Sequence, residues 1–309
     1  MVRLVFKIRP ASDFGSRLTG GMLFGHVAWR VRETLGEARL QDCLAGYEKG
    51  APFLVLSDAF PSGFAPLPAI PTSWWAETDH AAQRKRLKAK RWLPLKALKE
   101  PLSAWSAQAV SDAELPRSCA GRAVDRQHNT ISRFVSSTTS AGFAPYVVSA
   151  TSFSDEAQFD VYADLDEERL GRDELGRLLE DVGTLGYGRD ASTGLGRFEV
   201  EAMNVLEPPP AARCWLALSA MSPGGAPFDA DKCFYRPMTY FGRHGNVRAL
   251  GGTPFKKPIV LADAGAWVTL TERRSILFAG RGIKGHSAYA DTVHQGYAPL
   301  LPILGADHE

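Results

Sequence analysis

A run of glycines between a helical pattern and a strand pattern constrains this chain more than any other sequence feature. Apolar residues recur at helical spacing from Leu175 to Leu185, and Phe198–Ala202 alternates as a strand does. Glycines stand between them at positions 186, 188, 194 and 196. Glycine adopts positive φ at little steric cost and lets the backbone approach a neighbour closely. The chain must therefore pass from a helix into a strand through a tight loop.

The rest of the first half also alternates between strand and helix patterns. Strands are expected over Val2–Ile8, Phe53–Asp58 and Phe159–Ala163, the first of them half-buried because apolar and polar residues alternate. A helix is expected over 23–35, where apolar residues recur at helical spacing, and a second one over 37–45. Residues 61–71 are expected to form a Pro-rich surface loop. The order β-α-(insertion)-β-α-β, with antiparallel pairing, predicts a split βαβ, ferredoxin-like domain.

The stiff run Pro208–Pro210 predicts a domain boundary. We expect an N-terminal domain over 1–207, with an insertion at about 72–149, and a C-terminal domain over 208–309. Strands are expected there over 214–218, 275–279 and, more weakly, 259–261. The predicted fold class is α+β, and the strand-rich second domain is interpreted as a degenerate copy of the first.

Composition leaves the kind of partner open. The chain has 309 residues, 45% hydrophobic and 23% charged, with a net charge of +2 and a pI of about 8.3. A basic surface must therefore come from local clustering. The densest cluster, residues 84–91, has six Lys or Arg in eight positions. It is either a solvated helix face or a patch that follows a nucleic-acid backbone, and Trp92 beside it favours the patch.

Cysteines and the N-terminus point to a cytoplasmic protein. The four cysteines form no CxxC pair, which fits neither a zinc ribbon nor a disulfide framework. The first residues lack the layout of a signal peptide, and no apolar run is long enough to span a bilayer. No metal or other cofactor is expected, and no membrane partner.

The chemistry of the glycine-rich run suits an anion. Successive amides in such a turn can form an anion-binding nest, to which Arg189 and Arg197 add charge and Ser192 and Thr193 add hydroxyls. The alternative is a helix C-cap with a tight turn into a strand. The run lacks the ending of a Walker A loop and has the reverse order of a Rossmann fingerprint. A second glycine loop over 280–285 supports the same interpretation more weakly.

Catalytic patterns are poor, so we expect the chain not to be an enzyme. No HExxH or HxH pair occurs, and no carboxylate cluster suits two metal ions. His26 lies within a helix pattern, whereas His128 lies in a polar stretch beside Arg126 and Asn129. His128 is either a general base for RNA cleavage or a contact to phosphate or base. Two alternatives to RNA holding stay open: a metal-independent endoribonuclease and a scaffold that contacts only protein.

Six segments, in this order, resemble subunit four of the Csm complex, a RAMP-superfamily protein of the Cas-five group from type III-A CRISPR–Cas effectors. They are Leu18–His26, Ser57–Pro61, His128–Arg133, Asp190–Phe198, Pro254–Pro258 and Gln295–Pro299. The resemblance spans nearly the whole chain. It implies two RRM-like domains and an inserted thumb-like hairpin that presses on the duplex of guide and target RNA.

The resemblance also implies a function without catalysis. Such a subunit holds the 5′ repeat-derived tag of the crRNA, docks on the large polymerase-like subunit and on the first backbone RAMP subunit, and meets target RNA only indirectly. Some Cas-five relatives process crRNA, which keeps the endoribonuclease alternative open. The RNA-binding candidates are Thr19, Gly20, Gly21, Arg126, His128, Asn129, Arg133, Gly188, Arg189, Ser192, Thr193, Gly194, Leu195, Gly196, Arg197, Arg281, Gly282 and Lys284.

Overall fold

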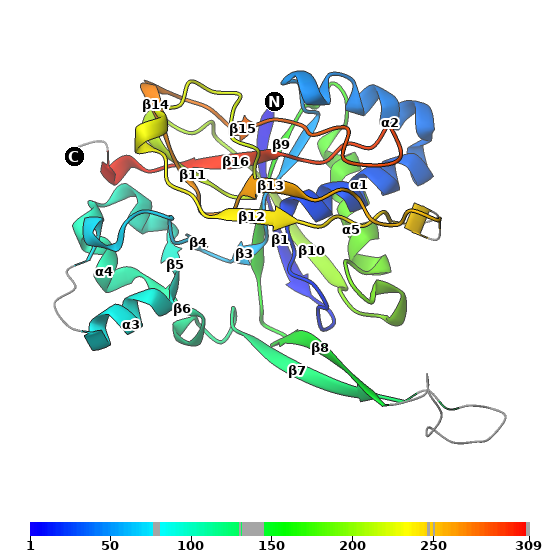
Figure 1. Ribbon diagram of the computed structural model, residues 1–309, viewed down its shortest axis with the longest axis horizontal. Coiled ribbons are helices and arrows are strands. Elements are labelled where there is room, and N and C mark those ends of the chain that lie inside the picture. The colour runs from blue at the N-terminus through cyan, green and yellow to red at the C-terminus, as the bar shows by residue number, and fades with distance from the viewer. Residues whose placement is uncertain (77–80, 130, 132–144, 246–247, 250, 307–309) are drawn as a thin grey trace.

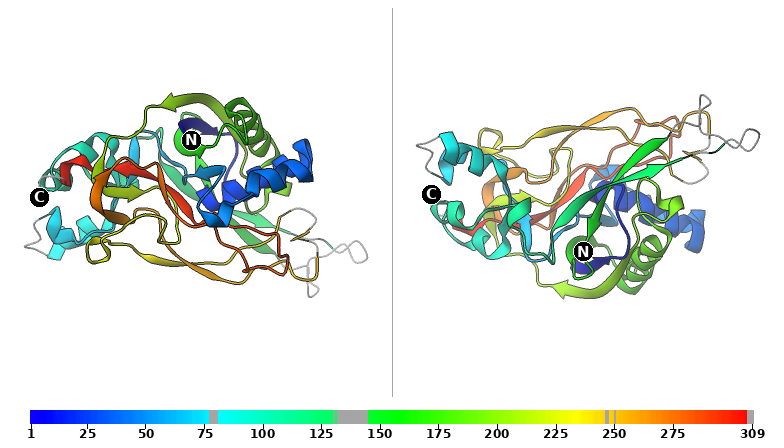
Figure 2. Two further views of the ribbon diagram at one scale, coloured as in Figure 1. Left: turned by 90° about the horizontal axis from the view of Figure 1, so that it is seen from above. Right: turned by 90° about the horizontal axis from the view of Figure 1, so that it is seen from below.

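The computed structural model describes residues 1–76, 81–129, 131, 145–245, 248–249 and 251–306 (Figure 1). The chain has an α+β fold in which antiparallel sheets pack with helices, as expected. A two-stranded hairpin projects from the body (Figure 1, Figure 2).

The first sheet has the strand order β10-β1-β9-β2, and its neighbouring strands are antiparallel. Along the chain its elements are β1 (Val2–Pro10), α1 (Gly20–Leu35), β2 (Leu54–Leu56), β9 (Phe159–Leu165), α5 (Arg172–Leu185) and β10 (Phe198–Leu206). This is the connectivity of a split βαβ unit. The short strand β3 (Phe60–Pro61) also pairs with β9, and α2 (Glu37–Leu44) follows α1. The strands and helices predicted for this half are confirmed, with ends shifted by a few residues.

Helices α1 and α5 cover one face of this sheet. Leu4, Phe6 and Ile8 of β1 are buried in one cluster with apolar residues of both helices, such as Phe24 and Leu178. The apolar spacing that predicted the helices is thus the stripe that contacts the sheet.

The second sheet has the order β14-β11-β16-β15 and is also antiparallel. Its strands are β11 (Ala212–Ala217), β14 (Trp267–Arg274), β15 (Phe278–Gly280) and β16 (Tyr297–Pro302). Strands β14 and β16 were not predicted, and the sequence of β16 carries no alternation of apolar and polar residues. The ferredoxin-like character of this half and the boundary at 207/208 stay predictions.

The second sheet packs on the face of the first sheet that the helices leave open. Val5 of β1 and Tyr162 of β9 lie in one cluster with Leu216 of β11. The half-buried character predicted for the first strand is confirmed, because Leu4, Phe6 and Ile8 are buried while Val5, Lys7 and Arg9 on the other face stay partly exposed; Arg3 is the exception.

Arg3 joins the two sheets. Its side chain lies in β1 opposite Asp164 of β9 and is 3% exposed. Its Nε and Nη2 donate to the two carboxylate oxygens of Asp164, both at 2.8 Å. Its Nη1 also donates to the carbonyl of Leu300 in the second sheet at 2.6 Å, and its Nη2 to that of Leu277. A buried charge is tolerated only when paired in this way.

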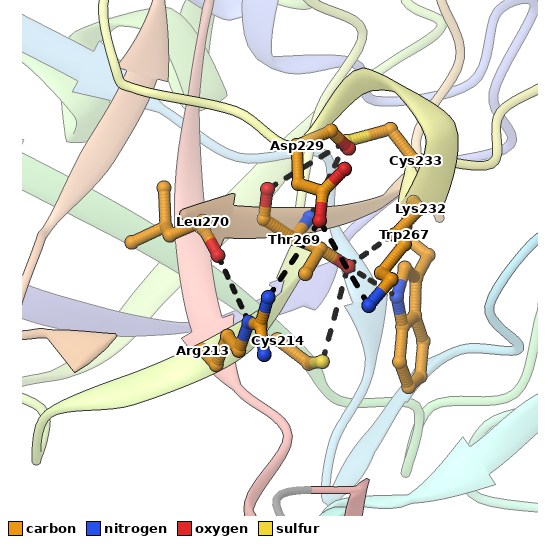
Figure 3. A network of polar contacts seen from close by, with 8 residues as sticks. All are labelled: Arg213, Cys214, Asp229, Lys232, Cys233, Trp267, Thr269 and Leu270. Atoms are coloured by element: carbon orange, nitrogen blue, oxygen red, sulfur yellow. Dashed lines mark hydrogen bonds and ion pairs between the residues drawn. The ribbon is translucent and has the colours of Figure 1, made fainter. Parts of the chain in front are cut away.

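A two-stranded ribbon of β12 (Pro237–Tyr240) and β13 (Ile259–Ala262) leaves the second sheet. A polar network fastens its base to β14 (Figure 3). Thr269 accepts from Trp267 Nε1 at 3.1 Å and donates to the carbonyl of Lys232 at 2.7 Å. Asp229 lies 3.6 Å from the guanidinium of Arg213. The turn that leads into β12 is thereby held.

The insertion is more regular than the sequence suggested. It follows β4 (Phe64–Pro66) and contains α3 (Ala81–Ala89), β5 (Lys90–Pro94), α4 (Trp105–Gln108), β6 (Val110–Ser111), β7 (Gly121–His128) and the start of β8 (Tyr146–Phe153). Strands β4, β5 and β6 form one sheet, and β7 with β8 forms the hairpin. The surface loop predicted over 61–71 is wrong in part, because Ala65 and Ile70 are buried in the cluster around Trp105.

The basic cluster 84–91 spans the end of α3 and the start of β5. Arg84, Lys85, Arg86 and Lys88 are exposed, and Lys90 pairs with Glu114 at 2.8 Å. Both interpretations of the cluster remain compatible with this exposure. No helix within the described ranges is long and apolar enough to cross a membrane.

We predict that Arg3→Met lowers the free energy of unfolding by about 3–5 kcal/mol, because Asp164 is left as an uncompensated buried charge. The double variant Arg3→Met/Asp164→Leu should recover most of this loss. Urea denaturation of both variants measures the difference, with the exposed Arg177→Met as control. A loss in Arg3→Met no larger than in that control would contradict a structural role for the pair.

Candidate nucleic-acid interface

The glycine-rich loop from Gly186 to Arg197 is held in one conformation by backbone geometry. Gly186, Gly188, Gly194 and Gly196 all have positive φ, between 73° and 96°. A Cβ on Gly196 would lie 2.1 Å from the carbonyl oxygen of Tyr187, so no other residue fits there. Asp190, at φ 62°, is the one non-glycine residue with positive φ in the described ranges.

Most amides of the loop donate within the protein. Tyr187 N donates to Gly196 O at 2.9 Å and Gly188 N to His26 Nε2 at 3.3 Å. Arg189 N and Arg197 N donate to the hydroxyls of Ser16 and Ser12. The amides of residues 190–192 have no such acceptor among the described residues. The anion nest expected for the whole run is therefore narrowed to these three amides.

Side chains of the loop divide into anchors and exposed groups. The Arg189 guanidinium donates to the carbonyls of Gly15 and Ser149, and so ties the loop to the first turn and to β8. Arg197, Ser192 and Thr193 are exposed. The Arg197 guanidinium has no hydrogen-bond or ion-pair partner within the described part of the chain. Arg197 is thus the cation that this loop presents to solvent, whereas Leu195 and Gly196 are buried.

The start of α1 lies beside this loop. Thr19 N donates to the Tyr187 hydroxyl at 2.9 Å, and Gly20 N donates to Asp58 Oδ1 at 2.9 Å. Gly20 is buried, and a Cβ there would lie 2.1 Å from the carbonyl oxygen of Leu56. Its place in the fold is a close approach of α1 to β2, while Thr19 and Gly21 remain partly exposed.

The hairpin carries the third group of predicted residues. Arg126 pairs with Asp13, and the ring of His128 stacks on that of Tyr146 with centroids 5.4 Å apart. Asn129 is exposed, and Arg133 lies outside the described residues. The base of the hairpin contacts the first turn through a bridge between Phe14 and Thr151. The hairpin and the glycine-rich loop therefore share one anchoring segment, residues 12–16.

The second glycine loop lies against the turn after α2. Lys284 pairs with Glu48 at 3.0 Å, and a Cβ on Gly282 would lie 2.6 Å from the carbonyl oxygen of Tyr47. Arg281 donates to the carbonyl of Pro223 and is exposed.

A groove of about 580 Å³ runs along the outer side of α1 and connects the surroundings of the two loops. Its wall includes Leu185 and His26 near the first loop and Lys284 in the second. Residues from 240–245, Arg248 and residues 291–294 also line it. Its charged lining residues are mostly basic: Arg30, Arg32, Arg243, Arg248, Lys256 and Lys284 stand against Glu33, Glu37, Glu48 and Asp291.

Residues of this groove were largely missed from the sequence. Arg248 and Lys256 are isolated in the chain, and only the segment Pro254–Pro258 signalled Lys256. Arg248 and Lys256 come close to α1 only in the folded chain.

His26 lies in this groove as a neutral ring. Burial lowers its pKa to about 4, and its Nε2 accepts from Gly188 N. Its ring lies 5.0 Å from that of Tyr187. Among the described residues no group of three or more His, Cys, Asp or Glu could hold a metal ion.

Comparisons with known proteins extend the argument from geometry. No protein-family model matches the chain, and no curated protein does. Solved structures do match over nearly the whole length. A crystal structure of a Csm1-Csm4 cassette in complex with pppApA matches with a TM-score of 0.58 and 16% identity, covering 97% of each chain.

Two further structures agree with this match. A Csm1-Csm4 cassette in complex with cA4 gives a TM-score of 0.59 at 16% identity, covering 97% of each chain. A Csm3-Csm4 subcomplex of the type III-A CRISPR-Cas interference complex gives 0.57 at 13% identity, covering 98% of this chain and 99% of that one. The chain therefore shares its overall fold with chains of Csm assemblies, as the resemblance implied, whereas the two RRM-like domains stay a prediction.

We predict that Asp58→Asn removes a pH dependence of stability. Burial raises the pKa of Asp58 from 3.8 to about 6. The folded state thus binds the proton more tightly, so the stabilisation is full below pH 3.8 and is lost as pH rises through 6. Asparagine keeps the acceptor for Gly20 N without a charge.

At pH 8 the variant should be about 2–3 kcal/mol more stable than the natural protein, and the difference should shrink towards pH 4. Denaturation curves between these pH values measure it, with the exposed Asp155→Asn as control. A difference that stays constant with pH would contradict the buried carboxylate as its source.

Proposed function

We propose that this chain is the non-catalytic crRNA-binding subunit of a type III-A CRISPR interference complex. It holds the 5′ repeat-derived tag and bridges the large polymerase-like subunit to the backbone subunits. The observation that carries the proposal is the groove along α1, which runs from Leu185, next to the first glycine-rich loop, to Lys284 in the second, on a chain with the fold found in Csm1-Csm4 and Csm3-Csm4 assemblies.

The mechanism of binding is capture of the RNA backbone. Arg197 and the amides of residues 190–192 offer donors to phosphate, and Ser192 adds an exposed hydroxyl. Single-stranded RNA exposes its bases, so side-chain edges along the groove read a few of them and set the register. Most of the affinity is electrostatic and falls with salt.

The hairpin acts at a distance from this groove. Its two strands expose Tyr146 and Val147, and the His128–Tyr146 stack offers an aromatic surface. Aromatic side chains stack with bases of any sequence. This composition supports a thumb that presses on the duplex of guide and target RNA.

The groove favours holding over cleavage. His26 has its Nε2 occupied by Gly188 N, and with a pKa of about 4 it is a weak base at neutral pH. The Tyr187 hydroxyl beside it donates to Arg17 O at 2.9 Å and accepts from Thr19 N. Burial raises the pKa of Tyr187 well above its ordinary value. Neither group is available to remove a proton from a ribose hydroxyl.

We predict that Arg197→Ala reduces the crRNA content of the purified complex without unfolding the chain. The loss of a charge-assisted contact should weaken RNA binding roughly tenfold, because hydrogen bonds to charged groups are worth more than neutral ones. Quantification of extracted RNA measures it, with Arg177→Ala on the exposed side of α5 as control. Photo-crosslinking of the 5′ tag should reach residues 186–198, and an absence of such crosslinks would exclude capture by this loop.

We also predict that the isolated protein leaves repeat RNA intact in the presence of EDTA. The matched variants are His26→Ala and His128→Ala, and denaturing gels read the products. Specific cleavage that disappears in either variant would favour the endoribonuclease alternative.

A further inference from the structure

The ribbon of β12 and β13 has two unlike faces. Its backbone ladder continues past the strands, because His244 N donates to Pro254 O and Lys256 N to Gly242 O, both at 2.8 Å. Phe241 and Phe255 point outward and are 72% and 70% exposed. Tyr240, His244 and Lys256 point inward and line the groove along α1. The inward face is thus a polar wall opposite the helix.

Lys256 is a cation without a counter-ion. Its side chain is half-buried, and its ammonium has no hydrogen-bond or ion-pair partner among the described residues. Burial lowers its pKa, and the charge of Arg248 lowers it further. An unpaired cation in such a place costs free energy unless an anion joins it.

Three histidines surround Lys256 and leave its charge uncompensated. His244, His286 and His294 are each about 5% exposed or less. Burial, with the Lys256 charge as a further cause, lowers the pKa of His286 to about 4 and that of His294 to about 3. They are therefore neutral rings near pH 7. Neither ring nitrogen of His286 has a partner in the described structure.

The carboxylate of Asp291, which also lines the groove, is already paired. Asp291 accepts from the Arg248 guanidinium at 2.8 and 3.2 Å. Arg248 in turn lies over the rings of Tyr289 and Trp29. The other carboxylates among the described lining residues are paired as well: Glu33 with Arg30, Glu37 with Arg32 and Glu48 with Lys284.

We infer that this wall of the groove is a phosphate site for single-stranded RNA, in which Lys256 is the counter-ion and the imidazole of His294 supplies a hydrogen-bond donor, whereas His244 Nε2 is held by the Ser287 hydroxyl at 3.0 Å. The inference rests on the proposed function for RNA as the source of the phosphate. It adds a second anchor across the groove from the glycine-rich loop. A strand gripped on both sides is fixed in direction as well as in register.

The test compares full-length Lys256→Met with Lys256→Arg and with Lys99→Met, an exposed lysine of the insertion. A fluorescent short single-stranded RNA is the probe, titrated at several salt concentrations. Lys256→Met should weaken binding about tenfold. It should also reduce the slope of log affinity against log salt by about 0.7, the value for one phosphate contact on a single strand. Lys256→Arg should retain most of the affinity and of the salt slope, and Lys99→Met should change neither quantity.

Thermal unfolding without RNA supplies a readout that a merely structural lysine would not give. Because the Lys256 charge is unpaired, Lys256→Met should raise the melting temperature. A slope unchanged by Lys256→Met, with RNA still bound, would overturn this site and leave the proposed function standing.

A second arm distinguishes the source of the phosphate. AMP and inorganic phosphate are added to the RNA-free protein, and their thermal shifts are compared between the natural chain and Lys256→Met. If the natural chain binds no RNA but AMP gives a Lys256-dependent shift, RNA is excluded as the source and the proposed function fails with it. If neither RNA nor AMP binds, the site itself is excluded.

Discussion

The buried pairing of Arg3 with Asp164 is the interaction on which the rest of the structure depends. Both residues belong to the first sheet, yet the guanidinium also binds two carbonyls of the second sheet. A buried charge must be fully paired, so the two sheets can pack only in the arrangement that satisfies these contacts. That arrangement carries the ribbon of the second sheet over α1 of the first. The groove between them exists because the sheets are joined in this way.

The glycine-rich loop serves both the fold and the proposed site. Its positive φ values and close contacts let most of its amides donate to residues 12–16, to His26 and to itself. Such internal hydrogen bonds hold the remaining amides and Arg197 in a fixed position towards solvent. Of the two interpretations that the sequence left open, the tight turn fits the internally bonded residues of the loop, and the anion site stays a proposal for Arg197 and the amides of residues 190–192. In the proposed site, the rigidity of the internally bonded residues keeps Arg197 and the free amides in place for binding.

Sequence patterns predicted the strands and helices of the first half, including β9, which is buried on both faces, and missed β14 and β16 of the second. The alternation of β1 and the apolar stripe of α5 were read correctly as strand and helix. The sequence of β16, Tyr297–Pro302, carries no alternation of apolar and polar residues, so its period does not mark a strand. The polarity of Arg3 does not reveal its buried partner Asp164, 161 positions away.

The sequence by itself determined the first split βαβ unit, the position of the glycine-rich loop between helix and strand, and the resemblance that its motifs carry. These features depend on residues that are close in the sequence, because residue spacing and backbone freedom determine local structure. Only the tertiary structure decided that Gly20 is buried, that Asp291 is used by Arg248, and that Lys256 faces α1 without a counter-ion. Charge pairing and desolvation depend on groups brought together from distant parts of the chain, and a linear pattern does not encode those distances.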